Sequence, residues 1–275
     1  MVLLDINFQL ELQKQETDRL RKDYHSNGFI LLKKVLDINS VAAARAALQA
    51  AVSEARRQAG SNAQRLSPLQ KYPHIVHPEL IPSLYKLCPD LQRAVEILFE
   101  DCITPCPDMA NDLHLTSLLI EPKTIKWSTG LHRDYRDFSD LDNQESLRRW
   151  RRACRDNSMF NQINISLYED DCLWVIPGSH QRNDNLLEKV LVSSRFILDY
   201  RYGITKKFPV FTNHLGWFKF ALKAIGAQQV LMSPGDALIY RNHILHTGLY
   251  YPGRTRMTIH DGVYSRNWHD FAVSI

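Results

Sequence analysis

The stretch Asn161-Gln162-Ile163-Asn164-Ile165-Ser166-Leu167-Tyr168 alternates between polar and apolar side chains. Successive side chains of a β-strand point to opposite faces, so Gln162, Asn164 and Ser166 share one face and the apolar residues share the other. The pattern therefore predicts a strand with one polar and one apolar face.

Several other short segments on both sides of this stretch read as strands. Turn residues close two of them, at Pro177-Gly178 and at Pro234-Gly235. Few helical patterns intervene, which argues against parallel βαβ units, and short strands bounded by Pro-Gly turns favour a sandwich or jelly-roll. The further expected strands are residues 114–120, 172–176, 228–232, 237–240, 244–247 and 255–259.

The N-terminal third is expected to be mainly helical, apart from a short buried strand at residues 29–32. Residues 37–40 supply N-cap candidates for a long helix that runs to Arg57. The other expected helices are residues 16–25, 81–87 and 91–99. We therefore expect one domain over residues 1–275, with a helical part at about 1–110 and a β core at about 111–265.

Composition excludes several classes of protein. Apolar residues make up 44% and charged residues 23% of the chain, as in ordinary globular proteins. A net charge of +4 is too small and too dispersed for a nucleic-acid-binding protein. The five cysteines show no paired spacing, no secretory segment is recognisable and no apolar run approaches membrane-spanning length. A cytoplasmic protein is expected.

Two candidate metal ligands, His132 and Asp134, stand two residues apart, and His246 offers a third. Two imidazoles and one carboxylate form the ligand set of non-haem Fe(II) oxygenases, which leaves positions open for a 2-oxo acid and dioxygen. Three alternatives remain. The residues could be ordinary loop and core side chains, a zinc hydrolase site, or the site of a non-catalytic cupin-like binding protein.

Arg256 follows His246 by ten residues and offers a bidentate fork for a carboxylate. Thr258 lies on the same face of the expected strand, so a guanidinium and a hydroxyl converge. Arg254 shares that face but adjoins the Pro252-Gly253 turn, which suits a surface salt bridge. We therefore favour Arg256, with Arg254 as the alternative.

These motifs resemble the phytanoyl-CoA dioxygenase family of Fe(II)/2-oxoglutarate oxygenases. The resemblance spans nearly the whole chain and implies a double-stranded β-helix, cupin-like and wrapped by N-terminal helices. The matching pieces are Asn27-Gly28-Phe29-Ile30-Leu31-Leu32, His132-Arg133-Asp134, Cys172 to His180, Pro234-Gly235-Asp236, His246 and Arg256. Pro177-Gly178-Ser179-His180 is a structural turn in that family, so His180 is not expected to bind metal.

The resemblance also implies a site and a reaction. His132, Asp134 and His246 would hold Fe(II), and Arg256 would hold the tail of 2-oxoglutarate. One of the inward-facing Gln162, Asn164 and Ser166 would also contact this co-substrate. Because the carboxylate Asp134 is retained, hydroxylation with O2, releasing succinate and CO2, is expected rather than halogenation.

The expected substrate is a free small molecule, because no basic cluster suits a coenzyme A tail; an acyl-CoA hydroxylase is the alternative within the family. Secondary-metabolite tailoring is a common role for such chains, and a cyanobacterial alkaloid-toxin hydroxylase of the cylindrospermopsin type is one example. Trp174 is a further candidate for substrate contact.

A densely charged insertion at residues 137–158 interrupts the strand series shortly after Asp134. Long insertions in compact β domains are often functional lids, and Trp150 lies on its apolar face. Arg148 and Arg149 would attract an anionic group of the substrate. The alternative is a solvated helix without a role in binding.

Overall fold

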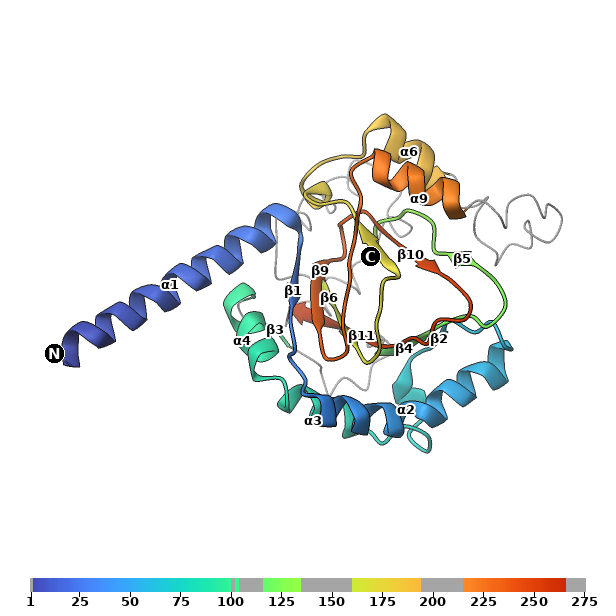
Figure 1. Cartoon of the computed structure of the whole chain (residues 1–275), viewed down its shortest axis with the longest axis horizontal. Helices are drawn as coiled ribbons and strands as arrows, with labels where there is room; N and C mark the ends of the chain where they lie inside the picture. Colours follow the sequence, from blue (N-terminus) through green and yellow to red (C-terminus); the bar gives the residue numbers. More distant parts are fainter. Residues whose placement is uncertain (1, 100–101, 104–115, 135–159, 194–214, 266–275) are drawn as a thin grey trace.

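The structure, a computed structural model, describes residues 2–99, 102–103, 116–134, 160–193 and 215–265. Two antiparallel sheets form its centre (Figure 1). The larger sheet has the order β1-β9-β6-β11-β4-β2, with β3 paired to β11, and the smaller has the order β5-β10-β7-β8. With its flanking helices, this is the double-stranded β-helix expected from the sequence.

The larger sheet consists of β1 (Phe29–Leu32), β2 (Arg65–Leu66), β3 (Cys102–Ile103), β4 (Ser117–Ile120), β6 (Phe160–Ser166), β9 (Ala237–Arg241) and β11 (Met257–Ser265). The smaller sheet consists of β5 (Trp127–Ser128), β7 (Leu173–Val175), β8 (Gln228–Gln229) and β10 (His246–Tyr250). β8 is shorter than expected and β11 is longer. The polar His260 and Asp261 hide the continuation of β11 in the sequence, although this strand pairs with β6 along seven residues.

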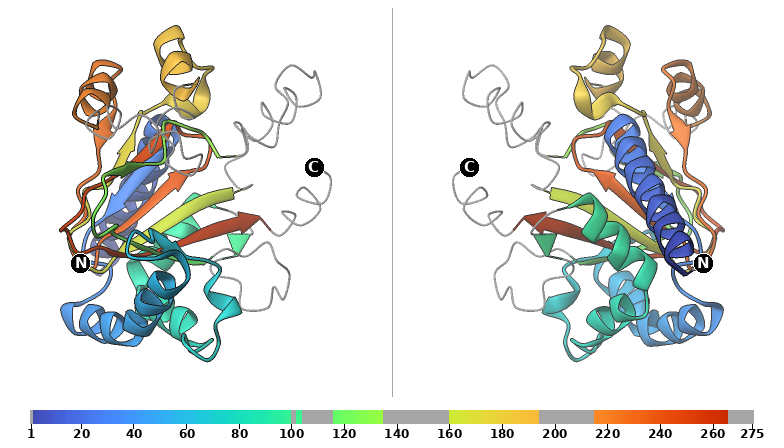
Figure 2. Two further views of the ribbon diagram at one scale, coloured as in Figure 1. Left: turned by 90° about the vertical axis from the view of Figure 1, so that its right-hand side faces the viewer. Right: turned by 90° about the vertical axis from the view of Figure 1, so that its left-hand side faces the viewer.

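Helices flank the two sheets, and α1 (Val2–Asn27) extends away from them toward the N-terminus (Figure 1). The N-terminal part also contains α2 (Ile38–Ala59), η1 (Leu69–Lys71), α3 (Leu80–Lys86) and α4 (Pro89–Leu98). Near the smaller sheet lie η3 (Ser179–Gln181), α6 (Leu186–Ser193) and α9 (Leu215–Ala224). Figure 2 shows α6 and α9 on one side of the strands and α2 and α3 on the opposite side.

The alternating stretch of β6 separates two environments. Ile163 and Ile165 are fully buried in the cluster that α2 and α4 form against the larger sheet. This confirms the predicted apolar face of β6. Asp37 begins α2 as expected, since its carboxylate accepts the amides of Asn39 and Ser40 at 2.8 and 3.0 Å.

The inner faces of the two sheets pack against each other. One half of this inner space is apolar, and it joins residues of β7 to residues of β1 and β9. The other half carries the polar side chains of β6 and β11. Among the described residues, no helix is long and apolar enough to cross a membrane.

Candidate metal centre and co-substrate site

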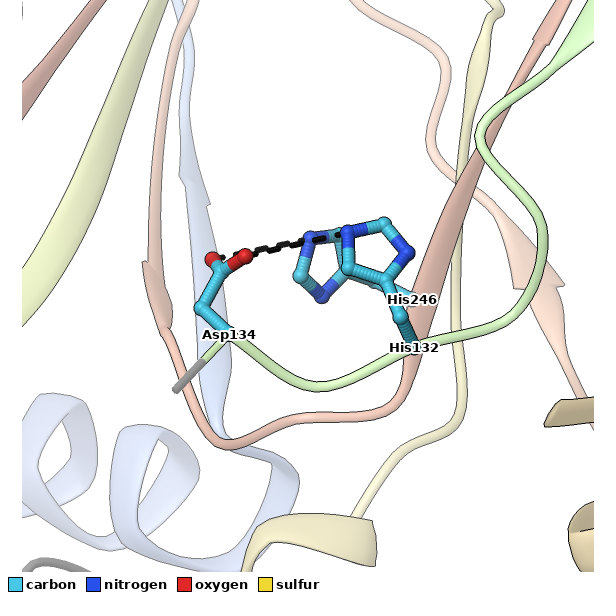
Figure 3. A group of neighbouring side chains, drawn as sticks. All are labelled: His132, Asp134 and His246. Carbon is cyan, nitrogen blue, oxygen red and sulfur yellow. Dashed lines mark ion pairs between the residues drawn. The ribbon is translucent and has the colours of Figure 1, made fainter. Parts of the chain in front are cut away.

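His132 and His246 face each other across two antiparallel chain segments. Each backbone amide donates to the other residue's carbonyl, at 3.0 and 2.9 Å. Asp134 is anchored beside them, because its amide donates to the carbonyl of Asn242 at 3.0 Å. The three side chains point toward one another, with one candidate ligand atom from each lying within 4.8 Å of the others (Figure 3).

Backbone carbonyls fix the orientation of both imidazoles. Nδ1 of His132 lies 2.8 Å from the carbonyl oxygen of Gly130, and Nδ1 of His246 lies 2.9 Å from that of Ile244. A carbonyl only accepts, so each Nδ1 carries a proton, and in the neutral imidazole each Nε2 then keeps its lone pair for a cation. The Nε2 atoms lie 3.7 and 3.8 Å from the Asp134 carboxylate, too far for a hydrogen bond. The three donors therefore surround a space that suits a cation.

Asp134 is ionised and partly accessible. Burial alone raises the pKa of this carboxyl, but His246, His132 and a hydrogen bond from Gln162 outweigh it and hold the pKa below its usual range. Its side chain is 27% exposed, against 7% for His246. The carboxylate side of the cluster is therefore more accessible to solvent than the His246 side.

The sequence indicated no role for Arg133, which lies between the candidate ligands His132 and Asp134. Its side chain is fully buried and forms an ion pair with Asp184 at 2.8 Å. It also donates to the backbone carbonyls of Ser179 and His243. Arg133 thus ties the ligand segment to the turn before α6 and to the segment before β10.

Arg256 is buried and is held from one side. Its Nε donates to Asp170 Oδ2 at 2.7 Å, and Thr258 Oγ1 donates to the same oxygen at 2.6 Å. The predicted convergence of Arg256 and Thr258 is present, but Asp170 is the carboxylate on which they converge. Another guanidinium nitrogen, Nη1, is buried and has no hydrogen-bond partner among the described residues.

The structure separates the two candidate arginines clearly. Arg254 pairs with Asp171, and its side chain is 61% exposed. Arg254 is therefore the surface salt bridge that its position beside the turn suggested, whereas Arg256 faces the inner space.

The polar residues of β6 lie in register with those of β11. Ser166 is opposite Thr258, and Asn164 is opposite His260. Gln162 contacts the metal cluster through its hydrogen bond to Asp134, while the Ser166 hydroxyl donates to the carbonyl of Tyr168. Of the three candidates, Gln162 thus contacts a candidate metal ligand directly.

His260 is a site residue that the sequence did not indicate. Its Nδ1 lies 2.7 Å from Asn164 Oδ1, and burial lowers the pKa of its imidazole to about 3, so the ring is neutral. His260 lies between the Thr258 and Gly262 positions of β11 on the inner face. The strand expected from the sequence ended at residue 259, so the inward position of His260 follows only from the greater length of β11.

Trp174, which the sequence suggested as a substrate contact, does not face the candidate metal centre. The Trp174 side chain packs in an apolar cluster with Phe218 and Leu222 of α9. In the pairing of β7 with β10, Trp174 lies opposite Thr247, whereas its neighbour Val175 lies opposite His246. Side-chain alternation along β7 therefore turns Trp174 away from the metal cluster. The predicted lid at residues 137–158, with Arg148, Arg149 and Trp150, lies outside the described residues.

The family model "Phytanoyl-CoA dioxygenase (PhyH)" matches residues 24–249. The chain belongs to this family. No curated protein sequence matches the chain.

Solved structures of similar fold include AviO1 from Streptomyces viridochromogenes Tue57, with a TM-score of 0.52 and 14% identity over 90% of this chain and 95% of that one. EctD from S. alaskensis with 2-oxoglutarate and 5-hydroxyectoine has a TM-score of 0.53 and 12% identity over 90% and 75%. EvdO2 from Micromonospora carbonacea var. aurantiaca, complexed with 2-oxoglutarate, has a TM-score of 0.50 and 15% identity over 90% of both chains.

Family membership makes this protein an Fe(II)- and 2-oxoglutarate-dependent oxygenase. The described residues fit both groups. Two imidazoles with fixed lone pairs and one ionised carboxylate suit Fe(II). Nη1 of Arg256, which is buried and has no hydrogen-bond partner in the described part of the chain, suits a carboxylate. Membership thus decides against a non-catalytic binding protein and against a zinc hydrolase.

Proposed function

We propose that this oxygenase hydroxylates a free small molecule, with His132, Asp134 and His246 as the iron ligands and Arg256 as the partner of the 2-oxoglutarate tail. The observation that carries the proposal is the fixed orientation of the two Nε2 lone pairs beside the Asp134 carboxylate. A site prepared in this way binds an ion without reorganising its ligands.

The reaction converts a substrate C–H bond to C–OH while O2 decarboxylates 2-oxoglutarate to succinate and CO2. The iron supplies the activation of dioxygen, and the protein supplies position and exclusion of water. Gln162 holds the Asp134 carboxylate, and the carbonyls of Gly130 and Ile244 hold the imidazoles. Arg256 gives the co-substrate tail a fixed counter-charge in a buried setting.

The apolar half of the inner space is packed core, in which Leu238 and Val175 are fully buried, whereas Asn164 and His260 lie in its polar half. We place secondary-metabolite tailoring, including alkaloids of the cylindrospermopsin type, first among the substrates to test. An acyl-CoA belongs in the same substrate panel.

The test is succinate formation from 2-oxoglutarate by Fe(II)-loaded protein, with a substrate panel and mass detection of a product heavier by one oxygen. Asp134→Ala should lower succinate formation by about 100-fold or more, since residues behind metal ligands already cost 10–100-fold. Glu169→Ala removes an exposed carboxylate and should leave the activity unchanged. Full activity of Asp134→Ala would refute the ligand assignment.

A further inference from the structure

Asp170 is a buried carboxylate that the proposed reaction does not use. It lies between β6 and β7, and its amide and carbonyl both pair with Met232 at 2.9 Å. Its side chain is 4% exposed, as is that of Arg256. Backbone pairing therefore fixes the place of this carboxylate beside the arginine.

Three donors converge on the two oxygens of Asp170. Arg256 Nε and Thr258 Oγ1 donate to Oδ2, and the amide of Cys172 donates to Oδ1 at 3.0 Å. An asparagine side chain has only one acceptor oxygen, so it could not accept from Arg256 and Thr258 on one side and from the Cys172 amide on the other. Burial alone raises the pKa of Asp170, but Arg256 and these hydrogen bonds lower it below its usual range.

The ion pair leaves part of the arginine available. Asp170 holds Nε, and the ring of Tyr250 lies 4.9 Å from the guanidinium carbon. Nη1 remains buried without a hydrogen-bond partner among the described residues. A buried donor of this kind is costly unless a ligand satisfies it. The guanidinium is thus fixed in orientation, and one of its nitrogens lacks an acceptor within the part of the chain that the structure describes.

We propose that Asp170 is a positioning residue, which holds the Arg256 guanidinium in the orientation that receives the tail carboxylate of 2-oxoglutarate. The inference rests on the proposed role of Arg256. A long side chain that is already ordered loses less entropy when its ligand binds. Without Asp170, Arg256 regains rotamer freedom and the co-substrate must order it.

A competing role of Asp170 would have the opposite effect on the affinity for 2-oxoglutarate. Asp170 carries a negative charge close to the site of another carboxylate, and like charges repel. If Asp170 only competed for Arg256, its removal would strengthen binding of the tail carboxylate. The sign of the change in affinity therefore distinguishes positioning from competition.

The experiment compares 2-oxoglutarate with 2-oxopentanoate, which has the same chelating head and chain length but no tail carboxylate. Binding to anaerobic Mn(II)-loaded protein is measured by titration calorimetry, without turnover. The dissociation constant of 2-oxopentanoate divided by that of 2-oxoglutarate reports what the tail carboxylate contributes to binding. Asp170→Asn and Asp170→Ala should each reduce this ratio at least tenfold, with metal stoichiometry unchanged.

Asp171→Asn is the matched control, because it removes the neighbouring carboxylate that pairs with the exposed Arg254. This variant should keep the wild-type ratio, and Arg256→Ala should bring the ratio close to one. Asp170→Glu keeps the charge but displaces it, so its ratio should also fall. Asp170→Glu carries the test if the Asn and Ala variants do not fold.

An unchanged ratio in the Asp170 variants, with both ligands weakened equally, would show a merely structural role and overturn the inference. A larger ratio would show competition and overturn it as well. If the wild-type protein itself failed to discriminate between the two acids, the proposed clamp at Arg256 would be wrong. Failure of the clamp is thus distinguishable from failure of the Asp170 inference.

Discussion

Asp261 is an ionisable residue on the apolar side of the larger sheet. It lies opposite Ile163 in β6 and is 3% exposed. Thr116 Oγ1 and the amide of Gly262 donate to it at 3.1 and 2.7 Å. Burial outweighs these bonds and raises the pKa of this carboxyl to about 6. Its charge is therefore a cost to the folded state at neutral pH.

We expect Asp261→Asn to stabilise the protein above pH 6 and to have little effect near pH 4. The folded state holds the proton more tightly than the unfolded state, so Asp261 lowers stability as the pH rises from about 4 to about 6. A shift of two units corresponds to at most about 3 kcal/mol. Urea unfolding of both proteins at pH 4 and pH 7.5 measures the difference, and an equal difference at both values would contradict the expectation.

The three candidate metal ligands could be selected from the sequence because their residue types and spacing carry the information, and the structure brings their side chains together. The sequence did not distinguish Asp170 from Asp171, two adjacent acidic residues in one loop. Only the pairing of Asp170 with Met232 sets which of them turns inward. The same limit applies to Trp174, since the direction of its side chain depends on the register of β7 with β10.

At the level of elements, two motifs that are far apart in sequence meet at Gly28. This residue joins α1 to β1 with a φ of 82°, and a Cβ there would clash with the His180 ring. The amide of Gly178 donates to the carbonyl of Asn27 at 3.0 Å, and His180 Nε2 lies 2.9 Å from that of His25. The predicted structural role of the turn before His180 agrees with these contacts.

Gly28→Ala should destabilise the protein by about 2–5 kcal/mol, from left-handed strain and from overpacking. His180→Ala removes the clash, so in that background the same change should cost only about 1–2 kcal/mol. Denaturant unfolding of the four proteins in this double-mutant cycle measures the coupling. Additive effects would show that Gly28 is required for its backbone conformation alone.

Most helices and strands followed from periodicity and caps, as for α2 and β6. The two-residue strands β2, β3 and β5 were not expected, because two residues cannot show alternation. These strands form only because longer neighbours offer free edges, which is a property of the assembled sheet. Tertiary pairing likewise extends β11 across its polar residues.

At the level of the whole molecule, a bound metal would join parts of the chain that are distant in sequence. His132 precedes β6, whereas His246 begins β10. A ligand that binds only the folded state stabilises it by about 2.7 kcal/mol at 100 times its dissociation constant. The stability of the fold should therefore depend on metal.

We expect anaerobic Fe(II) or Mn(II) at that concentration to raise the melting temperature by about 5–10 °C. A chelator should reverse the shift, and His246→Ala should abolish it. Asp171→Asn, whose change lies at the surface, should retain it. Differential scanning fluorimetry measures these shifts, and a full shift in His246→Ala would show that the metal binds elsewhere.

The strand order has a consequence for synthesis of the chain. Both neighbours of β6 in the larger sheet, β9 and β11, follow it in sequence. On the ribosome, β6 therefore emerges long before either partner, with both edges unpaired, although the helices α2 and α4 that cover its apolar face precede it. Such strands are prone to aggregate. A nascent chain that stops before Ala237 has no partner for β6, so slower elongation beyond Ser166 prolongs the vulnerable interval.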